Sequence, residues 1–182
     1  MQSCGHWYNS RYQICYSIYM AANAVGKRCS EVERAYIAGF LDADGAIMAI
    51  IERHKEKRFG FRIRVMIKIT QRDRSILDWM QKKLGVGRVR ANRLGDSRQT
   101  FDLHVLDQQH ARGLLKMLMP YVRAKKKQAR MALAILEATI ASKRDVIRIA
   151  QLADALSRFN VRSKDRRKNH AIKVQEHFSS ND

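Results

Sequence analysis

The sequence predicts an α+β fold in which the order αββαββα builds a curved, antiparallel four-stranded sheet, with additional helices after it. Three observations carry this prediction: 46% of the 182 residues are apolar, glycine and proline number only 9 and 1, and a helix-like segment followed by two strand-like segments occurs twice. The composition excludes a disordered or low-complexity protein. Helices are expected to cover one face of the sheet and leave the opposite face polar.

The first thirty residues differ from the rest in charge, because they contain no Asp or Glu, whereas all 17 acidic residues lie downstream. An acid-free, weakly basic segment is typical of an organellar transit peptide, and a read-in or poorly ordered extension is the alternative. We therefore expect an N-terminal extension over residues 1–30, one domain over 31–160 and a basic tail over 161–182, in which 162–168 form a solvated charge run. Three cysteines without ligand-like spacing favour a reducing compartment, whether an organelle (chloroplast or mitochondrion) or a bacterial cytoplasm.

The first helix is expected to begin after Ser30. Ser30 and Glu33 have the spacing of a capping box, in which each side chain binds the backbone N–H of the other residue. The helix should end near Gly45. Small residues recur every four positions along one of its faces: Ala35, Gly39 and Ala43. A glycine within a helix costs about 1 kcal/mol relative to alanine, and close contact with a second helix would offset the cost of Gly39.

Two strands are expected next, over residues 46–53 and 61–70. In the second strand, apolar residues alternate with positions that include Arg62, Arg64 and Lys68. One face of this strand therefore packs on a core and the other is cationic. The first strand is apolar on both faces, so its orientation stays open. In one orientation three of its residues join the cationic face, and in the other they belong to the core: Met48, Ile50 and Glu52.

The same pattern then repeats. A helix over residues 73–83 precedes a second hairpin, whose strands cover 88–93 and 99–106 and whose turn is 94–96. Polar residues again alternate with apolar ones on these strands, and they extend the polar face: Arg88, Arg90, Asn92, Thr100, Asp102 and His104. Three further helices follow, over residues 107–117, 125–139 and 144–159.

The excess of basic residues indicates the partner. Lys and Arg number 36 against 17 Asp and Glu, which gives a formal charge of +19, and a folded chain tolerates such self-repulsion most readily beside a polyanion. A curved sheet fits the major groove of double-stranded DNA, where arginine suits guanine. By the same geometry Asn92 suits adenine and Asp102 suits the N4 group of cytosine. The alternative is a solvated sheet face.

Other classes of function find no support in the sequence. The longest uncharged stretch is too short to cross a bilayer, so no membrane partner is expected. The histidines lack metal-ligand spacing, and no Walker, dinucleotide-binding or Gly-x-Ser-x-Gly pattern is present, so no small-molecule substrate is expected.

Residues 37–45 read Ile-Ala-Gly-Phe-Leu-Asp-Ala-Asp-Gly and resemble the signature nonapeptide of the LAGLIDADG homing endonucleases, with six positions matching letter for letter. The resemblance covers about 32–159. It implies an intron-encoded endonuclease that cuts double-stranded DNA at a long pseudo-palindromic site. Because the motif occurs once, it also implies a homodimer whose two signature helices pack along the twofold axis. The residues expected at that interface are Ala35, Ala38, Gly39, Asp42 and Ala43.

The chemistry expected at the end of this helix is metal-assisted phosphodiester hydrolysis. Asp44 matches the family's ligand, and the Ala43 carbonyl is a second candidate oxygen donor. Oxygen donors suit Mg²⁺ or Mn²⁺, which would polarise the phosphoryl group and lower the pKa of a bound water. The alternative for Asp44 is a helix-terminal residue that stabilises the turn at Gly45. Asp42 is expected to orient local backbone.

The resemblance implies further site residues. Gln71 resembles the glutamine that positions the attacking water, and Lys125 resembles the active-site lysine, a point charge near the phosphate. Related enzymes often place another basic residue four positions after the glutamine. Here that position is Ser75, so the adjacent Arg74 is the candidate for this role.

Two other functions remain open. The first is a binder without nuclease activity on the same fold, either an RNA maturase for intron splicing or a DNA-binding regulator. The second is a basic structural protein of nucleic acid. The presence of Asp44, Gln71 and Lys125 together favours the enzyme, because a binder needs none of them. The sequence does not reveal the target site.

Overall fold

The computed structural model of the protein describes residues 25–92, 99–160 and 170–180. It confirms the α+β class and the order αββαββα with helices after it. Its elements are α2 (Glu31–Asp44), β1 (Gly45–Arg53), β2 (Phe61–Gln71), α3 (Arg74–Leu84), β3 (Arg88–Asn92), β4 (Thr100–Val105), α4 (Gln108–Leu118), α5 (Lys126–Glu137), α6 (Lys143–Phe159) and α7 (His170–Ser179). Most of the expected N-terminal extension and the turn at 94–96 lie outside the described residues.

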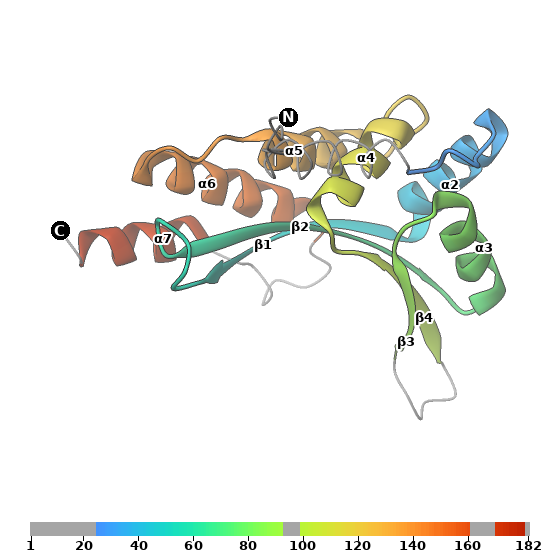
Figure 1. Ribbon diagram of the computed structural model, residues 1–182, viewed down its shortest axis with the longest axis horizontal. Coiled ribbons are helices and arrows are strands. Elements are labelled where there is room, and N and C mark those ends of the chain that lie inside the picture. Colours follow the sequence, from blue (N-terminus) through green and yellow to red (C-terminus); the bar gives the residue numbers. More distant parts are fainter. Residues whose placement is uncertain (1–24, 93–98, 161–169, 181–182) are drawn as a thin grey trace, which may run out of the picture.

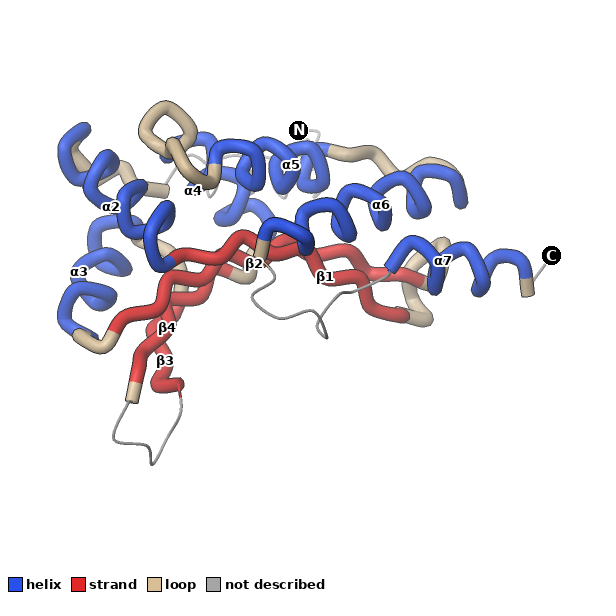
Figure 2. Tube along the Cα trace, turned by 180° about the vertical axis from the view of Figure 1, so that it is seen from behind, coloured by secondary structure: helices blue, strands red, loops and turns tan. Residues whose placement is uncertain are grey.

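The four strands form one antiparallel sheet in the order β1-β2-β4-β3. The helices α4, α5 and α6 cover one face of this sheet, and the opposite face carries no helix (Figures 1 and 2). β2 pairs with β4 only from Ile67 to Gln71. Beyond this shared stretch the two hairpins diverge, with β1–β2 running toward α7 and β3–β4 running away from the helices (Figure 1). The divergence gives the helix-free face its curvature.

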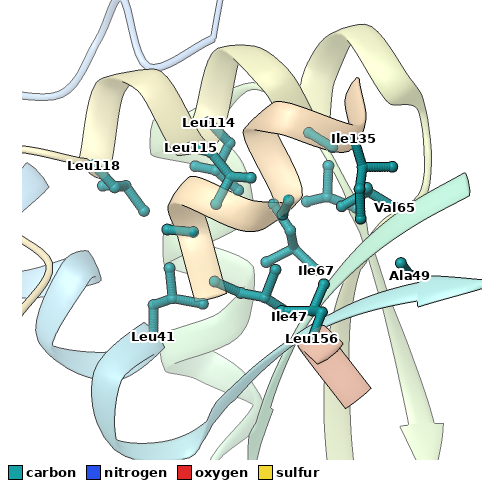
Figure 3. Packing of buried hydrophobic residues seen from close by; sticks show 14 of the residues in the cluster. Leu41, Ile47, Ala49, Val65, Ile67, Leu114, Leu115, Leu118, Ile135 and Leu156 are labelled. Atoms are coloured by element: carbon teal, nitrogen blue, oxygen red, sulfur yellow. The ribbon is translucent and has the colours of Figure 1, made fainter. Parts of the chain in front are cut away.

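The hydrophobic core lies between the sheet and the helices. Alternate residues of β1 and β2, among them Ile47, Ala49, Val65 and Ile67, are buried under the helices. Figure 3 shows them beside the buried residues of α2, α4, α5 and α6: Leu41, Leu114, Leu115, Leu118, Ile135 and Leu156. Each of these helices is apolar on one face. In the described residues no helix has both the length and the apolar character needed to cross a membrane.

The ends of α2 follow from its sequence. Ser30 forms the expected capping box with Glu33: its Oγ accepts from the Glu33 N–H at 3.3 Å, and its own N–H donates to the Glu33 carboxylate at 2.8 Å. At the other end, α2 passes into β1 at Gly45 without an intervening loop. A Cβ at Gly45 would overlap the Leu41 carbonyl oxygen and lie 2.8 Å from the Leu41 Cα, so a side chain does not fit there.

Within the basic tail expected over 161–182, residues 170–179 form the helix α7, whereas the solvated run expected over 162–168 lies outside the described residues. Val174 and Phe178 of this helix are buried against the rest of the chain. The backbone N–H groups of His170 and Ala171 donate to the carboxylate of Asp154 in α6 at 2.7 and 2.9 Å. The Phe178 ring also lies 5.8 Å from the ring of Phe61 in β2. The helix forms because neighbouring elements bury Val174 and Phe178 and cap its first turn.

Removal of the Phe178 side chain tests whether α7 is part of the core. Phe178→Ala should lower the free energy of unfolding by about 3 kcal/mol, the usual cost of emptying a buried aromatic site. Phe159→Ala, at the exposed end of α6, is the matched control and should change it by less than about 0.5 kcal/mol. Urea denaturation measures both, and equal small effects would contradict the packing of α7.

Candidate active site and polar sheet face

The end of α2 and the end of β2 meet, which brings Asp44 next to Gln71. β1 begins at the residue after Asp44, and Gly45 pairs with Ile69 of β2. Gln71 lies two residues further along β2, and its Nε2 donates a hydrogen bond of 2.6 Å to Oδ2 of the exposed Asp44. This contact orients the Asp44 carboxylate. Because the Gln71 amide donates to Asp44 through its nitrogen, its oxygen is the group that can accept a hydrogen bond from a water molecule.

Lys125 reaches the same place from the start of α5. Its Nζ donates to the backbone carbonyl oxygen of Asp42 and, at 3.4 Å, to that of Ala43, both in the last turn of α2. The carbonyls of a last turn lack intrahelical partners and carry the negative end of the helix dipole, so they favour an ammonium group. The structure thus gathers Asp44, Gln71 and Lys125 around the end of α2.

The donors at the end of α2 fit a hard divalent cation. Asp44 offers a carboxylate oxygen and Ala43 a carbonyl oxygen, which are ligands that Mg²⁺ and Mn²⁺ favour. Within residues 25–92, 99–160 and 170–180, no three His, Cys, Asp or Glu side chains gather in a possible metal site. Because both oxygens of the Asp42 carboxylate bind backbone N–H groups, Asp44 is the acidic ligand that one chain brings to this helix end, and an ion would need its other oxygen ligands from water, phosphate or a second copy.

Arg74 contacts Asp78 of its own helix and Phe101, the residue that pairs with Gln71 in the sheet. Its Nε lies 3.1 Å from the Asp78 carboxylate, and its guanidinium lies 5.8 Å from the centre of the Phe101 ring. Ser75 supports the start of α3, because its hydroxyl and its N–H both bind Asp73. These hydrogen bonds lower the pKa of the Asp73 carboxyl. The suggested role of Arg74 near the phosphate stays a prediction.

The polar residues of the four strands share the helix-free face. The register pairs Ile50 with Arg64, Lys68 with His104, and Arg90 with Asp102, and residues paired in this way lie on the same face of a sheet. This settles the orientation of β1 in favour of the cationic face. The polar face consists of Met48, Ile50, Glu52, Arg62, Arg64, Lys68, Arg88, Arg90, Asn92, Thr100, Asp102 and His104, together with Met66 and Thr70, which share the alternation of β2 but are not among the residues expected to contact DNA.

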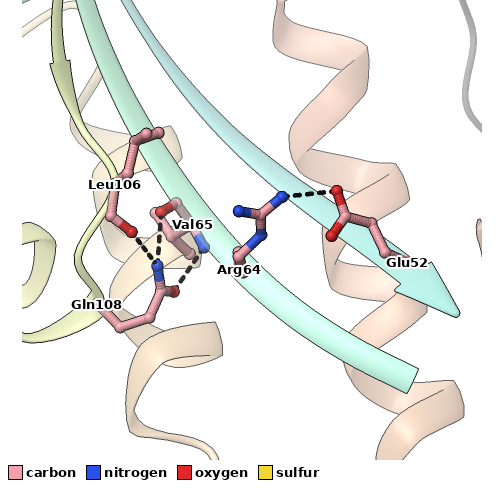
Figure 4. Close-up of polar contacts among 5 residues, drawn as sticks. All are labelled: Glu52, Arg64, Val65, Leu106 and Gln108. Carbon is pink, nitrogen blue, oxygen red and sulfur yellow. Dashed lines mark hydrogen bonds and ion pairs between the residues drawn. The ribbon is translucent and has the colours of Figure 1, made fainter. Parts of the chain in front are cut away.

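An ion pair orients one arginine of this face. Arg64 Nη2 lies 2.6 Å from Glu52 Oε1 on the neighbouring strand (Figure 4). Beside it, the Gln108 side chain makes the two hydrogen bonds that a neighbouring strand would make with Val65. Its Oε1 accepts from the Val65 N–H at 2.7 Å, and its Nε2 donates to the Val65 carbonyl at 3.0 Å (Figure 4). Gln108 therefore binds backbone groups of β2 next to the stretch that pairs with β4. The sequence analysis missed this residue, because a glutamine at the start of a helix does not differ in pattern from any other polar helix residue.

Asp102 differs from its expected role as a reader of cytosine. It is only 5% exposed, because neighbouring side chains surround its carboxylate. Oδ1 accepts from the Thr70 hydroxyl at 2.6 Å, whereas Oδ2 lies 3.3 Å from Lys68 Nζ and 3.5 Å from His104 Nε2. These contacts engage both oxygens within the protein. Asp102 thus holds three other polar side chains rather than presenting its own carboxylate.

His104 lies in a hollow of the polar face of about 570 Å³, which is lined among others by Met66, Arg88, Arg90 and His110. Burial lowers the pKa of His104, and the charges of Lys68 and Arg90 act in the same direction. Asp102 opposes them and raises this pKa, but burial is the larger effect. The net lowering favours a neutral imidazole in the folded protein.

The exposed side of α2 is lined by small and aromatic residues. Ala35, Gly39 and Ala43 are exposed, and so is Tyr36, whose ring packs edge-to-face on Phe40 at 5.0 Å. Val32, on the same helix, is 79% exposed to solvent. Two residues expected at a helix–helix interface lie elsewhere. Ala38 is fully buried within the chain. Asp42 directs its carboxylate to the backbone before α5.

Solved structures share this fold. A crystal structure of the homing endonuclease I-CvuI in complex with the I-CreI target, in the presence of Mg and with the DNA not cleaved, superposes with a TM-score of 0.72 at 28% identity, covering 82% of this chain and 94% of that one. The archaeal intron-encoded homing endonuclease I-Vdi141I complexed with DNA gives a TM-score of 0.69 at 22% identity, covering 82% and 98%. The second likeness shows the fold alone.

Sequence comparisons give the family. Residues 37–135 match the model of the LAGLIDADG endonucleases, which is more than half of the chain. The protein belongs to the LAGLIDADG endonuclease family. It is 32% identical over 104 residues to DNA endonuclease I-CreI of Chlamydomonas reinhardtii and 33% identical over 110 residues to DNA endonuclease I-CvuI of Chlorella vulgaris. These matches cover 56% and 59% of this chain and 61% and 65% of the relatives' length.

The lowered pKa of His104 predicts sensitivity to acid. Because the unfolded chain binds this proton more readily than the folded one, stability should rise with pH through the range just below the ordinary histidine pKa. Between about pH 7.5 and pH 5.5, wild-type protein should lose more unfolding free energy than the His104→Gln variant. Urea titrations at both pH values measure the difference. An equal loss in the two proteins would contradict the assignment.

Proposed function

We propose that this protein is a site-specific DNA endonuclease that acts as a homodimer and requires a divalent metal, Mg²⁺ or Mn²⁺. The observation that carries the proposal is the meeting of Asp44, Gln71 and Lys125 at the end of α2, beside a polar face rich in arginine. Family membership supports it, since I-CreI and I-CvuI are named DNA endonucleases. The chain matches about three fifths of I-CreI's length, so the proposal depends on the residues of this chain itself.

Each residue of the cluster has a separate task in phosphodiester hydrolysis. Asp44 would hold the cation, which when bound polarises the phosphoryl oxygen and lowers the pKa of a bound water. The Gln71 amide, already hydrogen-bonded to Asp44, would orient the attacking water through its oxygen. Lys125 would place its positive charge near the phosphate, where negative charge develops in the transition state. I-CvuI complexes with DNA have been solved in the presence of Mg and of Ca, which supports a divalent metal.

The polar face would contact the DNA. Its exposed arginines, Arg62, Arg88 and Arg90, have the geometry for guanine edges in the major groove, and Met48 and Ile50 suit thymine methyl groups. Buried Asp102 and paired Glu52 would orient neighbouring cations rather than contact bases. The resulting specificity would arise from side chains of four strands acting together.

The homodimer follows from the single acidic ligand in each chain. Cutting both strands requires two hydrolytic centres, and the exposed side of α2 offers a surface on which two copies of this helix can approach closely. Gly39 supports this, because a Cβ there would meet no atom of the described residues within 4 Å, so the described part of the chain gives no reason for a glycine.

Asp44→Asn tests the active site. The substitution keeps the shape of the side chain but removes the charge that holds the cation, so cleavage with Mg²⁺ should fall at least about a thousandfold. Affinity for the same DNA in Ca²⁺ should change less than about threefold, since the polar face is untouched. The substrate is a site selected by wild-type protein from a randomised DNA pool. Retained cleavage by the variant would overturn the assignment of Asp44.

Gly39→Leu tests the dimer. Leucine is the better helix former by roughly 0.8 kcal/mol and fits the protomer, so the variant should fold. It should nevertheless sediment as a monomer of 21.1 kDa, whereas wild-type protein should sediment as a dimer. Ala134→Leu, at an exposed position of α5, is the matched control and should leave the dimer intact. A dimeric Gly39→Leu variant would exclude the exposed side of α2 as the interface.

A further inference from the structure

Asp42 lies two residues before Asp44 and binds backbone far away in the sequence. Its Oδ2 accepts hydrogen bonds from the N–H groups of Arg123 at 2.6 Å and Ala124 at 3.1 Å, and its Oδ1 accepts from the N–H of Lys125 at 2.9 Å. Both carboxylate oxygens are therefore directed to the turn that leads into α5. This engagement leaves Asp42 neither pointing to a metal with Asp44 nor lining the exposed side of α2.

The turn before α5 needs an acceptor from outside. Lys125 is the N-cap of α5, makes no side-chain capping bond, and is followed by Lys126 and Lys127, with no acidic residue in the first turn. Positive charge is unfavourable at the positive end of a helix dipole, and the N–H groups there lack intrahelical partners. Asp42 supplies from α2 a negative charge beside this helix start, and it accepts from the N–H groups of the three residues that precede the first helical residue.

The same two residues are joined a second time. While the Asp42 carboxylate accepts from the backbone N–H of Lys125, the backbone carbonyl of Asp42 accepts from the Lys125 Nζ. Both ends of the lysine are thus fixed to one residue of α2, with the amine beside Ala43 and next to Asp44. A lysine side chain otherwise has about 2 kcal/mol of rotamer entropy to lose. Holding it in advance places its charge before the substrate arrives.

We infer that Asp42 is a positioning residue for catalysis, which acts by holding Lys125 at the end of α2. The inference rests on the proposed endonuclease function and deepens it. It assigns to the first acidic residue of the motif a task distinct from that of Asp44: Asp44 serves the cation, and Asp42 serves the lysine. The two carboxylates of one motif therefore have different partners, a metal ion for Asp44 and the backbone that carries Lys125 for Asp42.

Asp42→Asn is the first test. The amide keeps one acceptor oxygen but turns an NH₂ group toward backbone donors, so the turn at 123–125 should shift and carry Lys125 with it. The single-turnover cleavage rate at saturating DNA should fall about 10- to 100-fold, the effect of a misplacement of roughly 1 Å. DNA affinity in Ca²⁺ should stay unchanged. Asp42→Glu, which keeps the charge, should recover part of the rate.

A matched control separates positioning from general loss of structure. Asp154 of α6 also accepts two backbone N–H groups from another helix, those of His170 and Ala171 at the start of α7. Asp154→Asn removes the same kind of contact far along the chain from the end of α2. It should destabilise the protein to a similar extent but leave the cleavage rate within about twofold of wild type. Equal rate losses in both variants would overturn the inference.

A double-mutant comparison identifies the residue through which Asp42 acts. In the background of Lys125→Met, the further change Asp42→Asn should cost little additional rate, because no amine remains to be placed. Multiplicative losses would contradict the inference.

Acylation of Lys125 by an amine-reactive ester provides a readout independent of cleavage. Mass spectrometry should find it faster in Asp42→Asn than in wild type or Asp154→Asn, and unchanged reactivity would contradict the inference. Faster acylation in a protein that cleaves no selected DNA would reject the proposed function while supporting the contact.

Discussion

The passage of α2 into β1 at Gly45 is the constraint on which both the sheet and the candidate site depend. Since a side chain at Gly45 would overlap Leu41, glycine allows the strand to begin where the helix ends. Asp44 therefore has a fixed position relative to the strand register, and Gln71 comes beside it through the pairing of Gly45 with Ile69. The carboxylate of Asp42 brings the start of α5 to the same helix end. Backbone geometry, rather than a long loop, thus holds the three residues together.

The polar face combines exposed cations with cations that carboxylates already hold. Arg64 is paired with Glu52 and Lys68 with Asp102, whereas Arg62, Arg88 and Arg90 are exposed. A held side chain loses less rotamer freedom when it meets a ligand, so its contact is more directional. An exposed arginine can adapt to phosphate or base. The acidic residues therefore lower the charge of the face and at the same time define the direction of its donors.

Local pattern was sufficient to predict most of the fold. The capping box at Ser30, the alternation in β2 and the motif at 37–45 each depend on residues close in sequence, and the structure confirms the elements that they predict. Helical periodicity also separates Ala38 from the small residues on the exposed side, since adjacent helix positions differ by about 100°. The interface prediction did not apply this, and Ala38 proved to be buried.

The remaining features depend on contacts between distant segments. α7 has only Val174 and Phe178 buried, and its stability comes from α6 and from Phe61 of β2, which no local pattern reveals. The burial of Asp102 depends on the β2–β4 register, which places Thr70 and Lys68 beside it. The sequence could identify Asp42 as different from Asp44, but its hydrogen bonds to residues 123–125 required the tertiary structure.

The Glu52–Arg64 pair has a consequence for how such a protein changes its target. Replacing Arg64 alone would leave the Glu52 carboxylate without its guanidinium and turned toward an approaching polyanion, so a single exchange adds repulsion as well as losing a contact. Evolution at this place is therefore expected to proceed by coupled exchanges across the hairpin. Exposed positions such as Arg62 can drift one at a time. The polar face of the sheet is thus expected to contain positions that change slowly, because they change in pairs, and positions that change more rapidly, because they change singly.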